Sequence, residues 1–204
     1  MYFVKTPWFI KKWFNTYVWD IKTNEKIIYL TFDDGPHLIA TPFVLKMLKQ
    51  YNATATFFCI GKNVQQHQDI YNSILNECHI VGNHTQNHKN GWQTKDNDYI
   101  DDISIAATLI DSKLYRPPYG KITKFQADLL QKIGFKIVMW DVLSGDFDSN
   151  ISSKNCLNNV LLNAKSGSII VFHDSQKAFE KLEFVLPKVL DFFSKKGYVF
   201  KSIS

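Results

Sequence analysis

Short apolar runs alternate along most of this chain with segments whose apolar residues recur three or four positions apart. Runs rich in β-branched and aromatic residues are typical of buried strands, and the wider spacing is typical of helices that bury one face. The predicted strands cover residues 26–32, 53–60, 79–82, 114–116, 135–142, 168–172 and 198–203. The predicted helices cover residues 41–51, about 70–75, 99–110, 125–133, 155–164 and 179–196. This alternation predicts a parallel sheet covered by helices, and its seven units favour a small or incomplete barrel over an open sheet, although periodicity does not separate the two.

Single residues refine three of these helices. Thr41 followed by Pro42 predicts a helix start, with the threonine as N-cap and the proline at the first helical position. Leu75 and Phe125 are expected to face inward with the other apolar residues of their helices. Gly134 is expected to end the helix that carries Phe125.

Residues 7–19 precede the first predicted strand and carry aromatic side chains at helical spacing, with Phe9, Trp13 and Tyr17 four positions apart. Two interpretations are open. The aromatic stripe either closes one end of the core, or it lies on a membrane surface, as Trp and Lys at a helix edge allow. We therefore divide the chain into an N-terminal aromatic segment, residues 1–25, that packs on the barrel or on a membrane, and one domain, residues 26–204.

Composition and charge narrow the class of protein. The 204 residues suit one large domain, and 45% hydrophobic with 21% charged residues is an ordinary globular balance. The net charge of +5 is mild and the basic residues are scattered, so we expect no nucleic-acid partner. No run approaches the ~20 apolar residues that span a bilayer, and residues 1–20 lack the order of a signal peptide. We therefore expect a location in the cytoplasm or at the inner face of the membrane.

Charged side chains gather directly after the predicted strands. The carboxyl ends of parallel strands form the active-site face of barrels and open α/β sheets, so residues in these positions are expected to meet. Five separate segments contribute to this predicted rim, through Asp33 and Asp34, His84 and His88, Arg116, Asp141 and Asp146, and His173 and Asp174.

His84 and His88 are four positions apart, a spacing that places two imidazoles on one side of a helical turn and suits one divalent ion. A carboxylate from Asp33 or Asp34 would complete a site for zinc or another borderline divalent metal. Neighbouring side chains at a strand end diverge, so one aspartate is expected to bind metal and the other to take a proton from water. The structural alternatives are two solvated or core histidines and a capped Asp-Gly-Pro turn.

His173 and Arg116 suit supporting chemistry. A histidine at a strand end can donate a proton to a leaving group near neutral pH, or can be a satisfied core residue. Arg116 is the only arginine in the chain. A fixed guanidinium orients a neighbouring carboxylate and favours its ionised form, and the alternative is an ordinary structural ion pair.

The segments that carry these residues resemble the five ordered motifs of the NodB-homology polysaccharide deacetylases, carbohydrate esterase family 4. The matching segments are Thr31-Phe-Asp-Asp-Gly-Pro36, His84-Thr-Gln-Asn-His88, Arg116-Pro-Pro-Tyr-Gly120, Asp141 to Phe147 and Val171-Phe-His-Asp174. The resemblance implies a distorted (β/α) barrel of about seven parallel strands. It also implies a metal-dependent hydrolase that removes the N-acetyl group from an N-acetylated amino sugar and releases acetate.

The resemblance also implies a role for each matching residue. Asp34, His84 and His88 would hold a divalent metal, with zinc expected first and cobalt, nickel or manganese as alternatives. Asp33 would be the general base, oriented by Arg116, and His173 would protonate the departing amine, oriented by Asp146. The backbone N–H of Tyr119 would stabilise the oxyanion. Substrate contacts are expected from Tyr119, Pro118, Trp140, Phe147 and Val171.

Two positions depart from the family pattern. Phe147 stands where the fourth motif usually has Trp, and Val171 stands where the fifth motif usually has Leu. Both concern the apolar slot near the acetyl methyl, so they bear on substrate fit more than on chemistry. Two other functions stay open: the same metal site cleaving an O-acetyl ester or a cyclic amide, and a non-catalytic homologue that binds sugar.

Overall fold

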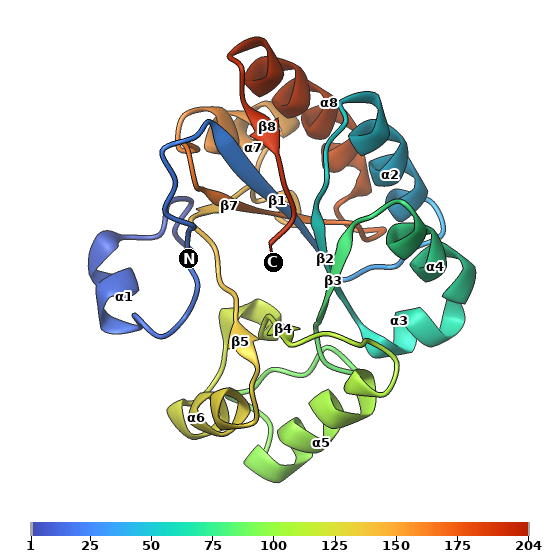
Figure 1. Cartoon of the computed structure of the whole chain (residues 1–204), viewed down its shortest axis with the longest axis vertical. Coiled ribbons are helices and arrows are strands. Elements are labelled where there is room, and N and C mark those ends of the chain that lie inside the picture. The colour runs from blue at the N-terminus through green and yellow to red at the C-terminus, as the bar shows by residue number, and fades with distance from the viewer. Residues whose placement is uncertain (1, 204) are drawn as a thin grey trace.

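One parallel sheet forms the centre of the computed structural model, which describes residues 2–203 (Figure 1). Its order is β5-β4-β3-β2-β1-β7-β6, and β8 pairs with the first residues of β1. The strands are β1 (Ile27–Asp33), β2 (Thr56–Cys59), β3 (Ile80–Asn83), β4 (Leu114–Tyr115), β5 (Lys136–Ile137), β6 (Val142–Leu143), β7 (Ile169–His173) and β8 (Val199–Phe200). Every strand pair runs parallel, and the sheet curls, which confirms the predicted distorted barrel.

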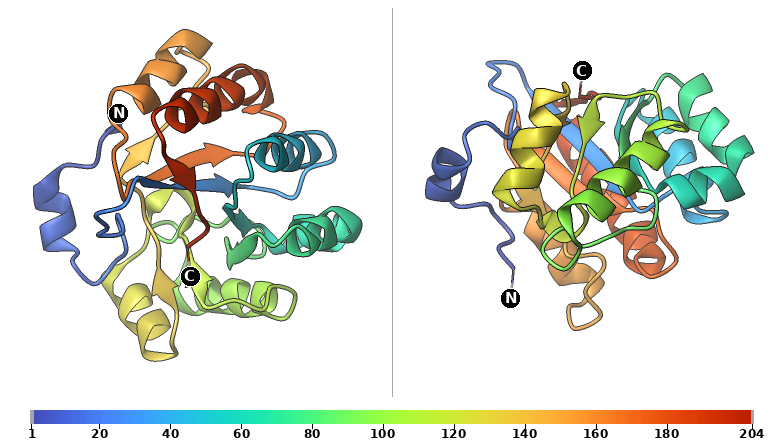
Figure 2. Two further views of the ribbon diagram at one scale, coloured as in Figure 1. Left: turned by 45° about the horizontal axis from the view of Figure 1, so that its top comes forward. Right: turned by 90° about the horizontal axis from the view of Figure 1, so that it is seen from below.

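Helices surround the curled sheet on its outer side (Figures 1 and 2). They are α1 (Trp8–Trp13), α2 (Ala40–Gln50), α3 (Gly61–Gln66), α4 (Gln68–Asn76), α5 (Asp96–Ala107), α6 (Lys124–Lys132), α7 (Ser153–Leu161) and α8 (Phe179–Lys195). After Trp13, each helix or helix pair lies between strands, as the alternation predicts. No helix within residues 2–203 is both long enough and apolar enough to cross a bilayer.

The core lies between the central strands and the helices that cover them. All seven residues of β1 are buried, as expected for a parallel strand covered on both faces. The rings of Phe57 and Phe172, from the two neighbouring strands, stack against Phe32 with centroids 5.1 and 6.0 Å away. These contacts pack β2 and β7 against β1, and the carboxyl ends of β1 and β7 carry the first and fifth sequence motifs.

Three local predictions about the helices were wrong. Helix α2 begins at Ala40, so Thr41 is inside the helix and its hydroxyl instead accepts a hydrogen bond from the His37 N–H. Leu75 and Phe125 are exposed, because α4 and α6 bury a narrower face than the full set of apolar residues predicts. Gly134, with a φ of +93°, does follow the end of α6 as expected.

The predicted strand 135–142 is two strands, β5 and β6, with a break between them. Asp141 therefore lies just before β6 instead of after a strand, and its prediction as a rim residue was wrong. Its carboxylate accepts hydrogen bonds from Lys5, Lys11 and Ser168, the last of which immediately precedes β7. Asp141 thus lies at the amino ends of these strands.

The N-terminal segment runs between the two edges of the curled sheet. On one side the Val18 N–H donates to the Ile137 carbonyl, and the Met139 N–H donates back to Val18. On the other side Lys5 bridges Val142, and the Leu143 N–H donates to the Val4 carbonyl. The segment therefore supplies hydrogen-bond partners to strand edges that do not pair with each other.

Helix α1 projects from the body of the protein, and none of its six residues is buried (Figure 1). Trp8 is 74% exposed and Trp13 is 82% exposed, whereas Trp19 is buried and donates its indole N–H to the Phe14 carbonyl. The aromatic residues of this segment are therefore divided between a part that packs on the barrel and a part that faces solvent.

Candidate active site

A cavity of about 410 Å³ opens where the carboxyl ends of β1, β3 and β7 meet. Its polar wall is formed by Asp33, Asp34, His84, His88 and His173. The cavity thus joins residues from the first, second and fifth sequence motifs, which are far apart along the chain.

Asp34, His84 and His88 form a compact three-ligand cluster on one side of the cavity. Each offers a ligand atom, and these atoms all lie within 4.8 Å of one another. Asp34 Oδ1 is 3.6 Å from His84 Nε2 and 3.2 Å from His88 Nε2. This oxygen is buried and has no hydrogen-bond partner among residues 2–203. A buried acceptor facing two imidazole nitrogens fits a divalent cation, because the ion satisfies all three lone pairs at once.

Both histidines are oriented by a second contact. His84 Nδ1 lies 2.8 Å from the Arg116 carbonyl oxygen, which can only accept, so Nδ1 carries the proton and Nε2 keeps its lone pair for the cluster. His88 Nδ1 lies 3.1 Å from the Tyr119 hydroxyl. Burial lowers the pKa of His84 to about 4, so its ring is neutral at pH 7, the form that binds metal.

The carboxylate of the cluster is ionised. Burial by itself would raise the pKa of Asp34, but the imidazoles around it, His88 first and then His173 and His84, together lower it well below its usual value. The Asn63 side-chain amide donates to the Asp34 carbonyl at 2.7 Å and fixes the backbone of the turn. Asp34 therefore brings a negative charge to the three-ligand cluster.

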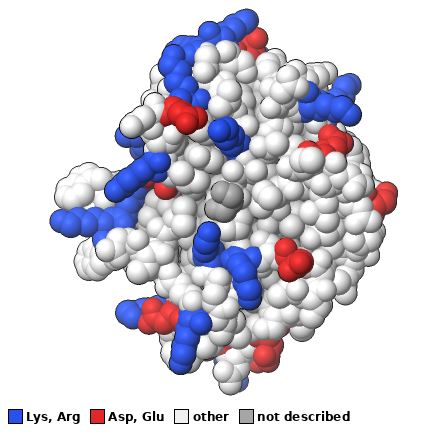
Figure 3. Space-filling view, in the orientation of Figure 1, with Lys and Arg blue, Asp and Glu red and all other residues white. Residues whose placement is uncertain are grey.

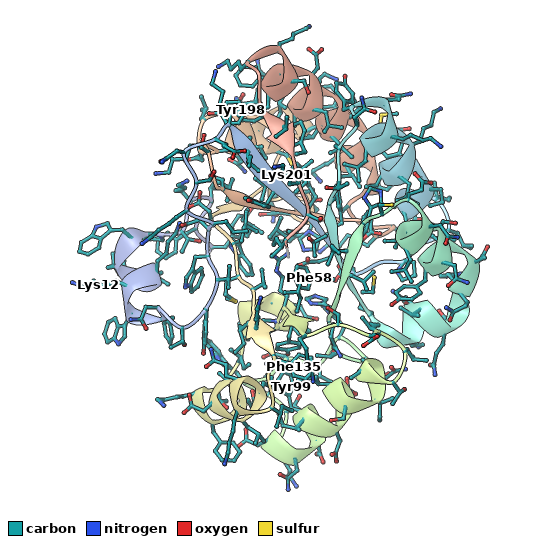
Figure 4. The ribbon with its side chains drawn as sticks, viewed as in Figure 1. Lys12, Phe58, Tyr99, Phe135, Tyr198 and Lys201 are labelled. Atoms are coloured by element: carbon teal, nitrogen blue, oxygen red, sulfur yellow. The ribbon has the colours of Figure 1, made fainter. Side chains whose placement is uncertain are left out.

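Asp33 is ion-paired with Arg116 and is not one of the three cluster residues. The Arg116 guanidinium is fully buried, donates to Asp33 Oδ1 at 2.7 Å, and lies 4.1 Å from the centroid of the Phe58 ring near the barrel centre (Figure 4). It also donates to Thr31 Oγ1 and to the carbonyls of residues 138 and 139. The adjacent aspartates thus have different partners, as expected for neighbours at a strand end.

At the end of β7, next to Asp33 in the sheet, Asp146 holds His173 through two contacts. Asp146 Oδ1 lies 2.8 Å from His173 Nδ1, and Oδ2 accepts from the His173 backbone N–H at 2.7 Å. Burial by itself would lower the pKa of His173, but the Asp146 carboxylate outweighs this and raises it to about 10. The imidazole is therefore protonated near neutral pH and can act as an acid.

Several residues of the site have a left-handed backbone. Asp34, His88 and Tyr119 have φ values of 79°, 55° and 60°, a region that few residues other than glycine adopt. Such conformations cluster at functional sites, where the surrounding structure holds them in place. Gly35 has a different constraint: a Cβ there would lie 2.1 Å from Asp174 Oδ2.

Asp174 was expected on the rim but does not line the cavity. It is buried behind the turn at Gly35, whose N–H donates to it at 3.1 Å, and it also accepts a hydrogen bond from the Thr41 hydroxyl. Burial raises its pKa to about 8, and the nearby Asp34 charge adds to this effect. Asp174 therefore stabilises the turn at Gly35 by accepting the hydrogen bond from its backbone N–H.

The apolar wall of the cavity includes most of the predicted substrate contacts. Tyr119, Trp140, Phe147 and Val171 line it, whereas Pro118 is buried and the proline that lines the cavity is Pro117. Besides Pro117, sequence reasoning missed five lining residues, namely Tyr2, Gly120, Leu143, Ser175 and Lys177. Leu143 and Ser175 lie close to motif residues in the sequence, so strand-end position would have indicated them, but no local pattern indicates Tyr2.

Comparison with known proteins identifies the family. A sequence profile described as polysaccharide deacetylase matches residues 20–138, more than half of the chain. A peptidoglycan-N-acetylglucosamine deacetylase of Bacillus cereus is 36% identical over 192 residues, which cover 91% of this chain and 90% of the relative. The chain belongs to the polysaccharide deacetylase family.

Two further comparisons agree with this assignment. The crystal structure of a peptidoglycan N-acetylglucosamine deacetylase in complex with 4-naphthalen-1-yl-N-oxidanyl-benzamide matches with a TM-score of 0.87 and 33% identity, over 97% of this chain and 95% of the other. A chitooligosaccharide deacetylase of Azorhizobium caulinodans is 34% identical over 161 residues, 76% of each chain. The polysaccharide deacetylase described here is therefore a hydrolase of carbohydrate esterase family 4, which acts on N-acetyl amide bonds.

The profile match includes the segments around Asp33, His84 and Arg116 and ends before Asp146 and His173. The structure places His173 in the same cavity as Asp33 and His84, with the buried Asp146 ion-paired to it from behind the cavity wall.

Proposed function

We propose that this deacetylase removes the acetyl group from N-acetylglucosamine units of a sugar polymer, with a divalent metal held by Asp34, His84 and His88. One observation carries the proposal: the three-ligand cluster shares one cavity with the Asp33 carboxylate, which is ion-paired to Arg116, and with the His173 imidazole, which is ion-paired to Asp146. The substrate class is supported by relatives named for peptidoglycan N-acetylglucosamine and chitooligosaccharide.

The residues around the cluster divide the proton transfers between them. A divalent ion held by the three ligands would acidify a water molecule and polarise the acetyl carbonyl. Asp33, held by Arg116, takes the proton as the water oxygen bonds to the acetyl carbon, and the backbone N–H of Tyr119 stabilises the oxyanion. The carbon–nitrogen bond then breaks, and His173 gives its proton to the leaving nitrogen. The products are acetate and the free amino sugar.

The protonation state of His173 favours an amide over an ester. An amine leaves readily only when its nitrogen gains a proton, whereas an alkoxide is a better leaving group and needs less help. With its pKa raised to about 10, His173 carries that proton throughout the neutral range. O-acetyl esters and cyclic amides are therefore secondary candidates on the same site, and a sugar-binding role without catalysis is the remaining alternative.

The test is acetate release from N-acetylglucosamine oligomers and from peptidoglycan, before and after chelation and after addition of zinc, cobalt, nickel or manganese. We expect chelation to abolish release, metal to restore it, and Asp33→Asn to lower it by about 10²–10⁴-fold. Asp128→Asn is the matched control, because this aspartate is exposed on α6. Release from O-acetyl sugars alone, or no release by metal-loaded protein, would reject the proposal.

We also propose that α1 contacts an anionic membrane surface. The outward residues of this helix are Trp8, Phe9, Lys12 and Trp13, and Lys12 projects from its outer side in Figure 4. Residues 2–19 contain three lysines and no acidic residue; Lys5 and Lys11 bind Asp141, and Lys12 is the exposed lysine on the outer side of the helix. Lys side chains also extend to the edge of the molecule where α1 projects (Figure 3). Exposed Trp beside Lys is the chemistry of a helix that lies in a lipid interface.

Flotation with vesicles tests this contact. We expect the protein to float with vesicles that contain phosphatidylserine. The Trp8→Ser/Trp13→Ser variant should bind these vesicles about tenfold more weakly for each tryptophan removed, because burial of a large apolar side chain contributes about 1.5–3 kcal/mol. Trp92→Ser is the matched control, since Trp92 is exposed but lies far from α1 in the sequence, before α5. Equal recovery of all three proteins in the soluble fraction, or equal binding to uncharged vesicles, would reject an anionic membrane contact.

A further inference from the structure

The first residues of the chain reach the active-site cavity by pairing with β6. The Leu143 N–H donates to the Val4 carbonyl at 2.8 Å, and the Thr6 N–H donates to the Asp141 carbonyl at 2.9 Å. Because Lys5 and Val142 are bridged in the antiparallel sense, the chain before Lys5 runs towards the carboxyl end of β6. This pairing brings Tyr2 to the cavity, although it lies far in sequence from every motif residue.

Tyr2 is held at the cavity by three contacts. Its ring centroid lies 5.3 Å from that of Phe147, and its hydroxyl donates to Asp148 Oδ2 at 2.9 Å. A Cβ added to Gly145 would lie 2.9 Å from the Tyr2 hydroxyl, so glycine at this position allows the close approach. Burial and the hydrogen bond to Asp148 raise the pKa of Tyr2 to about 12, which keeps the hydroxyl a donor over the neutral range.

Phe147 contacts both Tyr2 and His173. Its ring stands edge-on to His173 with a centroid separation of 5.1 Å, and it forms an apolar wall of the cavity together with Leu143 and Val171. The nitrogen that receives the proton from His173 must lie beside that imidazole. The acyl group attached to this nitrogen therefore falls against the nearest apolar wall.

We propose that Tyr2 is a positioning residue that fixes Phe147 and thereby sets the size of the acyl group that the deacetylase accepts. With Tyr2 in place, the wall beside His173 admits an acetyl methyl and disfavours a longer chain. Removal of the ring frees Phe147 to move and widens this space. The inference rests on the proposed deacetylation, and it adds a contribution from residues upstream of the family match at 20–138.

The test compares N-acetyl- and N-propionyl-glucosamine oligomers as substrates of the full chain. One additional methylene in an apolar pocket typically changes kcat/KM by about 10-fold or more, so the wild type is expected to prefer the acetyl substrate by about that factor. In Tyr2→Leu we expect the preference to fall below about threefold, mainly through a lower KM for the propionyl substrate. Tyr2→Phe keeps the ring and is expected to keep the preference.

Phe3→Leu is the control, because Phe3 is the next residue, is 60% exposed and does not line the cavity. An unchanged preference in Tyr2→Leu, or an equal loss in Phe3→Leu, would overturn the role of Tyr2 while leaving deacetylation intact. Failure of the wild type to release acetate would instead reject the proposed function. The position of the Phe147 ring in a crystal structure of Tyr2→Leu then tests the contact itself, and an unmoved ring would overturn it.

Discussion

Two ion pairs hold the side chains that face the cavity of this deacetylase. Arg116 anchors Asp33 on one side, and Asp146 anchors His173 on the other. The second pair is linked to pH because the folded-state pKa of His173, about 10, is above the ordinary histidine value of about 6.5. Its contribution to stability is therefore fully present below about pH 6.5 and is lost as the pH rises through about 10.

Asp146→Asn should change the pH dependence of the reaction. Without the carboxylate, burial is the dominant influence on the imidazole, so we expect His173 to lose its proton at a much lower pH. The basic limb of kcat/KM should move from near pH 10 towards or below about 6.5. Asp128→Asn should leave the profile unchanged. A basic limb that stays in place in Asp146→Asn would show that His173 is not the acid.

At the scale of elements, Asp141 joins the N-terminal segment to the barrel. Its side chain is 1% exposed and accepts from Lys11, Lys5 and Ser168, which belong to the segment and to the start of β7. Burial by itself would raise the pKa of Asp141, but these hydrogen bonds lower it below its ordinary value. A depressed carboxyl pKa contributes stability that is present above its unfolded value, about 3.9, and is lost as the pH falls through the folded value.

Asp141→Asn should therefore destabilise the fold at neutral pH and matter less in acid. We expect the free energy of unfolding to fall by about 1–3 kcal/mol at pH 7, the usual contribution of hydrogen bonds to a charged group. The difference from wild type should shrink towards pH 3. Urea unfolding at both pH values measures it, with Asp191→Asn as the control, since the pair of Asp191 with Lys195 is exposed and water screens it. A constant difference at both pH values would contradict the role of ionised Asp141.

At the scale of the whole molecule, Arg116 connects segments from three parts of the chain. It follows β4, reaches Thr31 and Asp33 on β1, and donates to the carbonyls of Val138 and Met139 after β5. The buried guanidinium thus hydrogen-bonds to acceptors in separate segments and holds these segments together inside the barrel. The same side chain is also the partner of the proposed base, so stability and activity depend on one residue.

Arg116→Met should destabilise the deacetylase by about 3–5 kcal/mol, because it leaves the buried Asp33 carboxylate without its partner. The double variant Arg116→Met/Asp33→Asn should lose less free energy of unfolding than the two single variants lose in sum, because it no longer contains an unpaired buried Asp33 carboxylate. Urea unfolding of the four proteins completes the cycle. Strictly additive losses would show that the two side chains do not interact in the folded protein.

Much of this architecture follows from local sequence patterns. The apolar runs predicted the strands, and the position of Asp33, His84 and His173 near strand ends predicted that these residues meet. Both predictions succeed because strand formation and side-chain alternation depend on a few neighbouring residues, and because parallel strands place their carboxyl ends on one side. The roles of these residues came from the family resemblance, and they remain proposals until the reaction is measured.

Other features depend on contacts between distant parts of the chain. The break between β5 and β6 moved Asp141 to the amino ends of the strands, and no pattern within residues 135–142 predicted it. Tyr2 reaches the cavity only because residues 4–6 pair with β6. The sequence alone determined the elements and the residues with reactive side chains, since these follow from local spacing. The neighbours of those residues were determined only by the folded chain, because hydrogen-bond pairing and burial join segments that are far apart in sequence.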